Sequence, residues 1–428
     1  MKSPVNTPPM AAFALVALLS TGASAEVPVK NAYPPEKETG FPVKDIDVEA
    51  IKKLREKNIA PPSPVNDADM VRVLLSESKD SIKISSDDTL ILTDLSSGKK
   101  IAAGNIKSAD IRKNSRGLMV NKLLFPSSVV KIETRIGTLS FAGKKYRGNF
   151  TVHAGNGSTV KLVNNVDIDD YLFGVVPSEM PAEWPMEALK AQAIASRTYT
   201  LYRIEESRKE PSIYHDVVAT VGDQVYGGMN SENERTSVAV YLTKGMALKY
   251  NNRIVKAYYH STSSTRTESG MEVFAGEEVP YLKGVSCTYA KNSPYSSWKE
   301  TIGLDELEDI LARNGYRVGN IINVSASGFT SSGRIHNLNI HTLTGVKTLK
   351  ATEFRRAVGT TRIKSTWFRI RKSGNTITLS GRGYGHGVGL CQWGAKEMAS
   401  KDFGYTDILS HYYPGTEISP TEFTFLEK

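Results

Sequence analysis

"PSEMPAEWPMEALKAQAIASRTYTLYR", residues 177–203, is the stretch on which the interpretation of the whole chain depends. From about Pro185 to Ser207, small and apolar residues recur at helical spacing, and Pro185 suits the first turn of a helix. The members of this stripe are Ala188, Ala191, Ala195, Tyr199 and Tyr202. Because small residues let neighbouring elements approach closely, we expect one long helix whose stripe lies in the core.

A single carboxylate, Glu179, lies just before this helix, between Pro177 and Pro181. Proline fixes φ and removes a backbone donor, which predicts a stiff, extended approach to the helix. A carboxylate held on such an approach is a candidate catalytic group. The alternative is a first-turn acid that only complements the helix dipole.

The composition is that of a globular protein: 428 residues, 40% hydrophobic and 23% charged, with a formal net charge of +9. The basic residues are dispersed and form no arginine-rich arm, so nucleic acid is not expected as a partner. The positive charge indicates an anionic partner, such as lipid head groups or cell-wall glycan, or serves solubility alone.

The N-terminus predicts export. Residues 1–25 combine Lys2, an apolar run and the sequence Ala23-Ser24-Ala25, which is typical of a signal peptide cleaved before Glu26. An uncleaved anchor is the alternative, and it would be the only link to a membrane. We therefore expect the protein in the periplasm or on the cell-wall side of the cytoplasmic membrane. The two cysteines, Cys287 and Cys391, could form one bridge or remain free buried thiols.

The remaining sequence predicts four regions. Residues 26–69 are a proline-rich linker, 70–170 mainly β, 171–415 mixed α and β, and 416–428 a C-terminal tail. Strands and helices do not alternate, so the expected fold class is α+β. We expect short-strand sheets and one long helix after the segment that carries Glu179. A second helix is predicted at 304–315 and a β-hairpin at 367–381.

Three stretches carry residues suited to chemistry: "VVPSEMPAEWPMEALKAQAIASRTY" (175–199), "KAYYHSTSSTRTES" (256–269) and "GRGYGHGVGLCQWGA" (381–395). In the third, the glycines allow left-handed backbone and close approach, but their spacing does not fit a dinucleotide or phosphate loop. In this order, the three stretches resemble the stage II sporulation protein D (SpoIID/LytB) family over roughly residues 70–415. Each motif alone is weak, and the combination is specific.

The resemblance implies a role on peptidoglycan, with a glycan-binding groove and a catalytic loop just before the long helix. Some members of the family are similar to lytic transglycosylases that act on peptide-stripped glycan, and others are described as amidase enhancers. By the resemblance, Glu179 is the catalytic residue. The substrate-binding candidates are Gln192, Arg197, His260, Ser261, Thr262, Tyr384, His386 and Gln392. Gln192 and Arg197 could instead only fix the position of the helix. His386 could instead form hydrogen bonds within its own loop.

The expected cofactor and metal content is none. Some family members hold zinc with a histidine at the position of His260 and cysteines shortly after it. Here Ser263, Ser264, Thr265 and Arg266 follow instead, and the next cysteine is Cys287. A zinc site normally takes at least three protein ligands, and this spacing does not supply them.

A lone carboxyl group suits transglycosylation. Ordinary glycosidases use two carboxylates. In lytic transglycosylation, the C6 hydroxyl of the muramic acid attacks C1 of the same sugar, so one carboxyl group can serve first as acid and then as base. Apolar neighbours such as Met180 and Trp184 would raise the pKa of Glu179, while a helix N-terminus would lower it. Asp169 and Asp170 are expected to cap a turn.

Lytic transglycosylation is therefore the expected function, with peptidoglycan glycan strands as the partner. The alternative is a non-catalytic, glycan-binding enhancer of a cell-wall amidase, which would have that amidase as a second partner. A wall-anchored structural protein would leave the loop around His386 unexplained.

Overall fold

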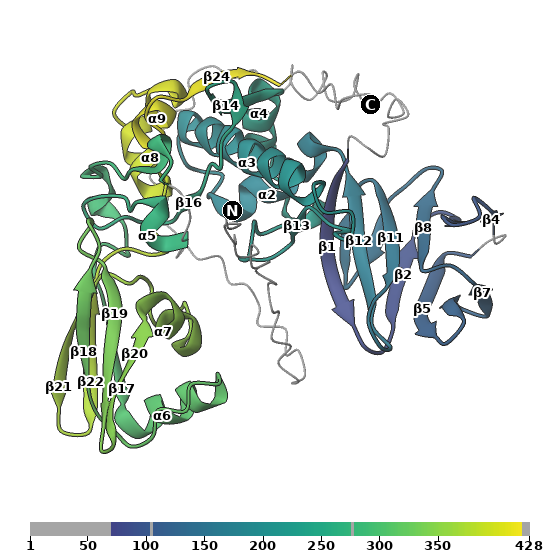
Figure 1. The fold of residues 1–428 in the computed structure, drawn as a ribbon. Coiled ribbons are helices and arrows are strands. Elements are labelled where there is room, and N and C mark those ends of the chain that lie inside the picture. Colours follow the sequence, from purple (N-terminus) through teal and green to yellow (C-terminus); the bar gives the residue numbers. More distant parts are fainter. Residues whose placement is uncertain (1–69, 103–105, 275–277, 422–428) are drawn as a thin grey trace, which may run out of the picture. The chain divides into compact units, whose positions relative to one another are not determined.

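The computed structural model describes residues 70–102, 106–274 and 278–421 (Figure 1). All of these residues belong to one compact unit, Lys44–Lys428. The predicted signal peptide and linker lie outside the described residues, as does 422–428 of the predicted tail. Within the described ranges, no helix is both long enough and apolar enough to cross a membrane.

The first part of the described chain is a pair of β-sheets that share one hydrophobic core. The sheet orders are β13-β1-β12-β11-β8-β3-β4 and β10-β9-β2-β5-β6-β7. The strands are β1 (Val71–Ser78), β2 (Ile82–Ser86), β3 (Leu90–Asp94), β4 (Lys100–Ala102), β5 (Ser108–Asn114), β6 (Gly117–Val120), β7 (Leu123–Phe125), β8 (Val129–Thr134), β9 (Leu139–Phe141), β10 (Lys144–Tyr146), β11 (Asn149–Ala154), β12 (Val160–Val166) and β13 (Val217–Val218). In β2, Ile82 and Ile84 are buried and the intervening Lys83 is exposed, as the period of two requires.

A group of helices follows and is centred on α3 (Met186–Ser207). The helix α3 packs against α2 (Ile168–Glu179), α4 (Glu234–Leu242), α8 (Gln392–Ala399) and α9 (Tyr405–Tyr412). The predicted long helix is thus confirmed, with Pro185 as its N-cap residue and Ala188, Ala191 and Ala195 fully buried. The small side chains let several helices pack directly against α3.

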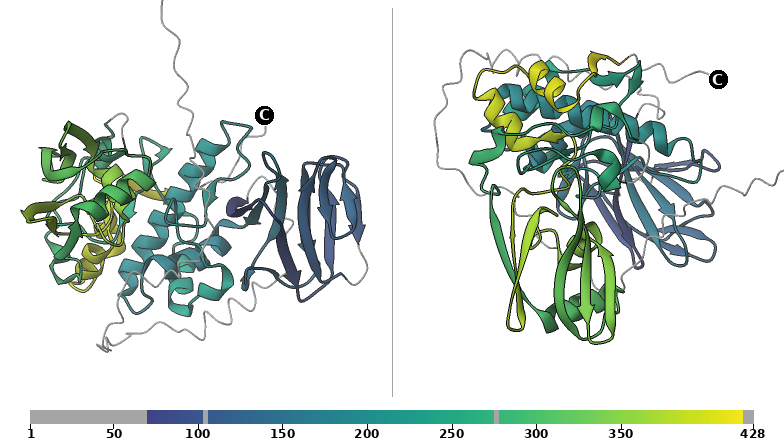
Figure 2. Two further views of the ribbon diagram at one scale, coloured as in Figure 1. Left: turned by 90° about the horizontal axis from the view of Figure 1, so that it is seen from below. Right: turned by 60° about the vertical axis from the view of Figure 1, so that its left-hand side comes forward.

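Residues 298–381 contain a second hydrophobic core, drawn in green in Figure 2. Two three-stranded sheets, β17-β22-β21 and β18-β19-β20, form it together with two helices. The elements are β17 (Trp298–Gly303), α6 (Leu304–Arg313), β18 (Ile321–Phe329), β19 (Ile335–Thr342), β20 (Gly345–Lys350), α7 (Ala351–Val358), β21 (Phe368–Ser373) and β22 (Thr376–Gly381). The predicted helix at 304–315 and the hairpin at 367–381 are confirmed.

Short elements join these parts. They are the 3-10 turns η2 (Gly228–Ser231), η3 (Pro280–Leu282) and η4 (Tyr289–Asn292), the strands β14 (Met246–Tyr250), β15 (Arg253–Ile254), β16 (Tyr259–His260), β23 (Leu390–Cys391) and β24 (Glu417–Pro420), and the helix α5 (Gly270–Phe274). The strand β24 pairs with β14, so these residues of the predicted tail are part of a sheet. The described chain combines helices with several separate, mostly antiparallel sheets, and the predicted α+β class is confirmed.

Candidate active site around Glu179

Glu179 is the last residue of α2, and the extended approach predicted for it is wrong. Asp167 caps the helix by accepting hydrogen bonds from the backbone N–H groups of Asp169 and Asp170. Pro177 lies inside the last turn of α2, where it has no backbone N–H to donate to the preceding turn. Met180 then adopts an extended conformation with φ −132° and ends the helix. Glu179 is therefore held by a helix C-terminus rather than by a proline-bounded segment.

The surroundings of Glu179 raise the pKa of its carboxyl group above the ordinary value. Burial is the largest cause, and the polar groups of Val225, Gln392 and Tyr259 oppose it. The Val225 N–H donates to Oε1 across 2.9 Å. Because a helix C-terminus disfavours a nearby anion, the position at the end of α2 acts in the same direction as burial. The expected raised pKa is confirmed, but the expected opposition from a helix N-terminus is not.

Two glutamines connect Glu179 to the glycine-rich motif. The side-chain amide of Gln392 donates to the Glu179 carbonyl at 3.0 Å and to Oε1 of Gln192 at 3.3 Å. Gln192 in turn donates to the hydroxyl of Ser196 at 2.9 Å. Both glutamines are almost fully buried. The structure therefore brings Glu179, Gln192 and Gln392 together, with the two glutamines hydrogen-bonded to protein groups.

Arg197 lies elsewhere in the core, completely buried. Its guanidinium pairs with Asp169 at 2.9 Å and donates to the carbonyls of Thr243, Val240 and Met246. These contacts join α3 to α2 and α4. This environment matches the alternative of a residue that fixes the helix, and it leaves the guanidinium no exposed face for a sugar.

The segment 259–262 lies beside the residues that precede Gln392, because β16 pairs in parallel with β23. The Tyr259 hydroxyl is buried and is one of the groups that lower the pKa of Glu179. Sequence analysis missed Tyr259, although its position beside His260 in a short strand was a usable signal. Since side chains alternate along a strand, Tyr259 and His260 face opposite sides.

His260 is buried and bonded to protein groups on both ring nitrogens. Nδ1 lies 3.1 Å from the Val388 carbonyl, and Nε2 lies 2.7 Å from the Ser263 hydroxyl. Its ring centroid is 5.6 Å from that of His386. Burial lowers the pKa of His260 well below its ordinary value and that of His386 to about 3, so both rings are neutral at physiological pH.

The other candidates from the second and third motifs meet across a backbone bridge. Thr262 and Tyr384 exchange backbone hydrogen bonds of 3.0 and 2.8 Å. Thr262 is buried and bonds the Ser293 hydroxyl, whereas Ser261 and Tyr384 are partly exposed. The structure thus gathers the 256–269 and 381–395 stretches into one unit.

The glycine-rich loop places every second residue in left-handed backbone. Gly383, Gly385, Gly387 and Gly389 all have positive φ, between +69° and +105°. A side chain at Gly389 would place its Cβ 2.0 Å from the Tyr258 carbonyl. The close approach expected at this loop therefore occurs against the chain itself, and it fixes the loop beside Tyr258–Ser264.

Both cysteines are buried and free, and Cys391 accepts a hydrogen bond from the Ser263 N–H at 3.2 Å. In the part of the chain that the structure describes, no three residues from His, Cys, Asp and Glu are grouped as metal ligands.

Two family models match this chain. A family model described as "Stage II sporulation protein" matches residues 156–250, which include Glu179 and all of α3. A second model, a domain of unknown function, matches residues 282–389 and so covers the second hydrophobic core.

Several relatives match over long stretches. The stage II sporulation protein D of Bacillus subtilis is 34% identical over 284 residues, 62% of this chain and 78% of its own length. An uncharacterised protein of Brachyspira hyodysenteriae is 34% identical over 319 residues, 74% of this chain and 84% of its own. The amidase enhancer of Bacillus subtilis is 32% identical over 293 residues, which are 58% of this chain and only 40% of the relative. The chain therefore belongs to the stage II sporulation protein D (SpoIID/LytB) family.

Proposed function

We propose that this protein is a peptidoglycan lytic transglycosylase that cleaves the bond from N-acetylmuramic acid to N-acetylglucosamine, with Glu179 as its acid and base. The supporting observation is a lone carboxyl group with a raised pKa. Among the described residues, the groups that shift this pKa are Val225, Gln392 and Tyr259, and none is a second carboxylate. Inverting and retaining glycosidases need two carboxylates, whereas intramolecular transglycosylation needs one.

The proposed reaction has two proton transfers. Protonated Glu179 donates its proton to the glycosidic oxygen while the C1–O bond breaks. The C6 hydroxyl of the same muramic acid then bonds to C1, and Glu179 takes up the hydroxyl proton. The products are a 1,6-anhydro end and a free 4-hydroxyl, and no water is consumed. Glu179 returns to its protonated form, which the raised pKa favours.

The other candidate residues are proposed to have two different roles, according to whether their side chains are exposed or buried. Ser261, Tyr384 and His386 are partly exposed and are proposed to contact sugar. The buried candidates already bond protein groups, so we revise their roles from substrate binding to positioning of the site; they are Gln192, Arg197, His260, Thr262 and Gln392. The protein is proposed to act outside the cytoplasmic membrane, on glycan strands stripped of stem peptides.

The amidase enhancer among the relatives supports a second candidate function. In that case the protein would bind glycan without cleaving it and would increase the rate at which a cell-wall amidase removes stem peptides. One experiment separates the two. The protein is incubated with intact and with peptide-stripped glycan, with and without an amidase, and the products are analysed by mass spectrometry. Anhydro ends made without amidase support transglycosylation; faster peptide release without anhydro ends supports the enhancer.

A further inference from the structure

A groove lies between two edge strands of the second hydrophobic core. The strand β18 is at the edge of the sheet β18-β19-β20, β21 is at the edge of the sheet β17-β22-β21, and the two strands pack against each other (Figure 1). The groove has a volume of about 750 Å³, which is within the usual range of ligand sites. Its lining residues all fall between 323 and 372, inside the part of the chain that matches a domain of unknown function.

Two aromatic side chains line this groove. Phe329, at the end of β18, is 65% exposed, so most of its ring is open to a ligand. Trp367, just before β21, is partly exposed, and the guanidinium of Arg382 lies over its ring at 5.2 Å from the centroid. Aromatic faces bind the apolar C–H faces of sugar rings, and sites for organic ligands are commonly lined by such side chains. The groove therefore offers stacking surfaces to a ligand that contains rings.

The charged side chains of the groove are all cationic. Arg369 and Lys372, both on β21, are exposed, and no aspartate or glutamate of the described chain lines the groove. Neither cation forms an ion pair or a side-chain hydrogen bond with another described residue. Positive charge without a neighbouring carboxylate attracts anions, and the attraction is stronger in a concave site than on an open surface. The groove therefore favours a ligand that is anionic as well as able to stack.

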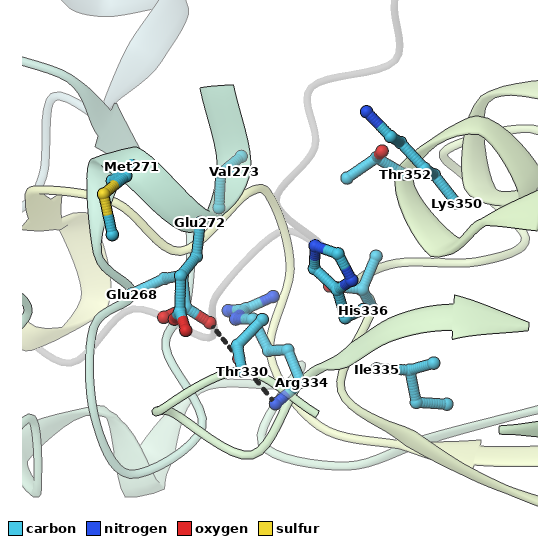
Figure 3. Close-up of a pocket in the computed structure, with 11 residues that line it drawn as sticks. Glu268, Met271, Glu272, Val273, Thr330, Arg334, Ile335, His336, Lys350 and Thr352 are labelled. Carbon is cyan, nitrogen blue, oxygen red and sulfur yellow. Dashed lines mark hydrogen bonds between the residues drawn. The ribbon is translucent and has the colours of Figure 1, made fainter. Parts of the chain in front are cut away.

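The Phe329 end of the groove is fixed to the stretch that contains His260. The turn after Phe329 places the Thr330 hydroxyl against Glu268, to whose carboxyl group it donates a hydrogen bond, beside a small cavity of about 130 Å³ (Figure 3). The Ser332 hydroxyl donates to the same carboxyl group at 2.5 Å. Because Glu268 is fully buried, it holds this turn, and with it the position of Phe329, against the second motif.

The Trp367 end of the groove is connected to the glycine-rich motif. The backbone N–H of Arg382 donates to the Trp367 carbonyl at 3.0 Å, in addition to the contact of its guanidinium with the indole ring. Arg382 lies two residues before Tyr384, which is proposed above to contact sugar. The groove is therefore attached at both ends to the motifs that surround the candidate active site.

We infer that the groove between β18 and β21 is a second binding site for the glycan strand, separate from Glu179. Sugar rings stack on Phe329 and Trp367, and the lactyl carboxylates of muramic acid pair with Arg369 and Lys372. A protein strand added to a sheet edge is the other class of ligand for such strands, but it binds through backbone hydrogen bonds and would not require these cationic and aromatic side chains. The inference rests on the proposed glycan substrate, and it gives the module at 282–389 a role in holding the strand.

The test is calorimetric binding of peptide-stripped glycan strands to the full chain, with Glu179→Gln present throughout so that the strands stay intact. Chitin oligosaccharides of matched length, which have the same sugar backbone without lactyl carboxylates, are the control ligand. Two changes are made in the groove: Phe329→Ala, and Arg369→Gln combined with Lys372→Gln. Each titration is repeated at low and at high salt.

Two control variants lie in the same module outside the groove. Arg371→Gln removes a charge from an exposed arginine of β21, and Leu343→Ala removes an apolar side chain that is 71% exposed between β19 and β20. Circular dichroism checks that every variant is folded, which the exposure of all the substituted side chains favours.

We expect Phe329→Ala to weaken the binding of both ligands about fivefold or more, because stacking does not depend on the carboxylates. The double charge variant should lose about fivefold in affinity for stripped glycan only, together with part of the salt dependence. Unchanged glycan affinity in the groove variants, or equal losses in the two controls, would overturn the inference. So would unchanged glycan affinity together with weaker binding of a cell-wall amidase, which would make the groove a surface for a protein partner.

The binding result is independent of the reaction. If the unmodified protein forms anhydro products but the groove variants bind glycan normally, the second binding site is rejected alone. If the groove variants lose glycan affinity as expected but the unmodified protein forms no anhydro products, the proposed reaction is rejected alone.

Discussion

The side-chain amide of Gln392 donates a hydrogen bond to the backbone carbonyl of Glu179 across 3.0 Å, although the two residues are 213 positions apart in the chain. This contact joins the first motif to the last one. It explains why both stretches belong to one site: the end of α2 carries the carboxyl group, and the start of α8 holds it in place.

Replacing Gln392 tests this contact through the pH dependence of the reaction. Gln392 lowers the pKa of Glu179, so Gln392→Leu should raise that pKa further. Because Glu179 must be protonated to act as an acid, activity falls as pH rises through its pKa. The alkaline limb of kcat/KM should therefore move to higher pH in the variant. Asn292→Ala, which removes a surface amide, is the control, and a limb that stays in place would contradict the assignment.

Glu179→Gln should increase stability at neutral pH. The folded pKa of Glu179 is above its unfolded value, so between the two the folded state binds more protons, and the stability contributed by this group is lost as pH rises. Glutamine has no such dependence. In urea unfolding, the free energy of unfolding of the variant should increase relative to that of the unmodified protein as pH rises from about 4.5 through the folded pKa of Glu179. A constant difference between the two proteins across that range would count against a raised pKa.

Arg197→Ala should destabilise the fold by about 3 kcal/mol, because it removes a fully buried guanidinium that pairs with the partly buried carboxylate of Asp169 and donates to several backbone carbonyls. Glycan affinity of the folded fraction should not change. The exposed pair Lys145–Asp87 offers the control, since Lys145→Ala should cost about 1 kcal/mol or less. Chemical denaturation and glycan binding are measured on both variants. If Arg197→Ala loses glycan affinity but keeps its stability, Arg197 binds substrate after all.

Two glycines with nearly the same φ test whether the loop is held by close packing. Gly389 and Gly245 have φ of +69° and +70°, but only Gly389 has a backbone atom in the way of a Cβ. Gly245→Ala should cost about 1 kcal/mol from conformational strain alone. Gly389→Ala should cost about 3 kcal/mol or more, since the Tyr258 carbonyl must move. Equal losses of unfolding free energy in the two variants, measured by urea unfolding, would mean that the close approach of Gly389 to the Tyr258 carbonyl does not contribute to stability.

Local patterns were sufficient to predict part of this structure. The helix α3, with its buried alanine stripe, and the hairpin of β21 and β22 follow from periodicity and turn residues, which act over a few positions. The helix α2 was missed because Pro177 indicated an extended segment, although Asp167 supplied the N-cap signal. Pro177 cannot donate a backbone hydrogen bond to the preceding turn, and the packing of α2 on α3 offsets that loss.

Residue type indicated the candidate site, whereas its geometry did not follow from the sequence. The raised pKa of Glu179 followed from its apolar neighbours, since burial dominates the shift. The burial of Arg197 and the groove between β18 and β21 depend on contacts between segments far apart in sequence, which spacing does not encode. Tyr259 was missed, although its position beside His260 in a short strand was a local signal.

The most direct test of the central claim is the product formed by Glu179→Gln from peptide-stripped glycan, analysed by mass spectrometry beside the unmodified protein. The unmodified protein should release fragments with 1,6-anhydromuramic ends, each lighter by one water than a hydrolysis product. The variant should bind the same strands and lose at least about 10² in rate, because glutamine keeps the shape but not the proton. Anhydro ends formed at a near-normal rate by the variant, or no anhydro ends from either protein, would contradict the account.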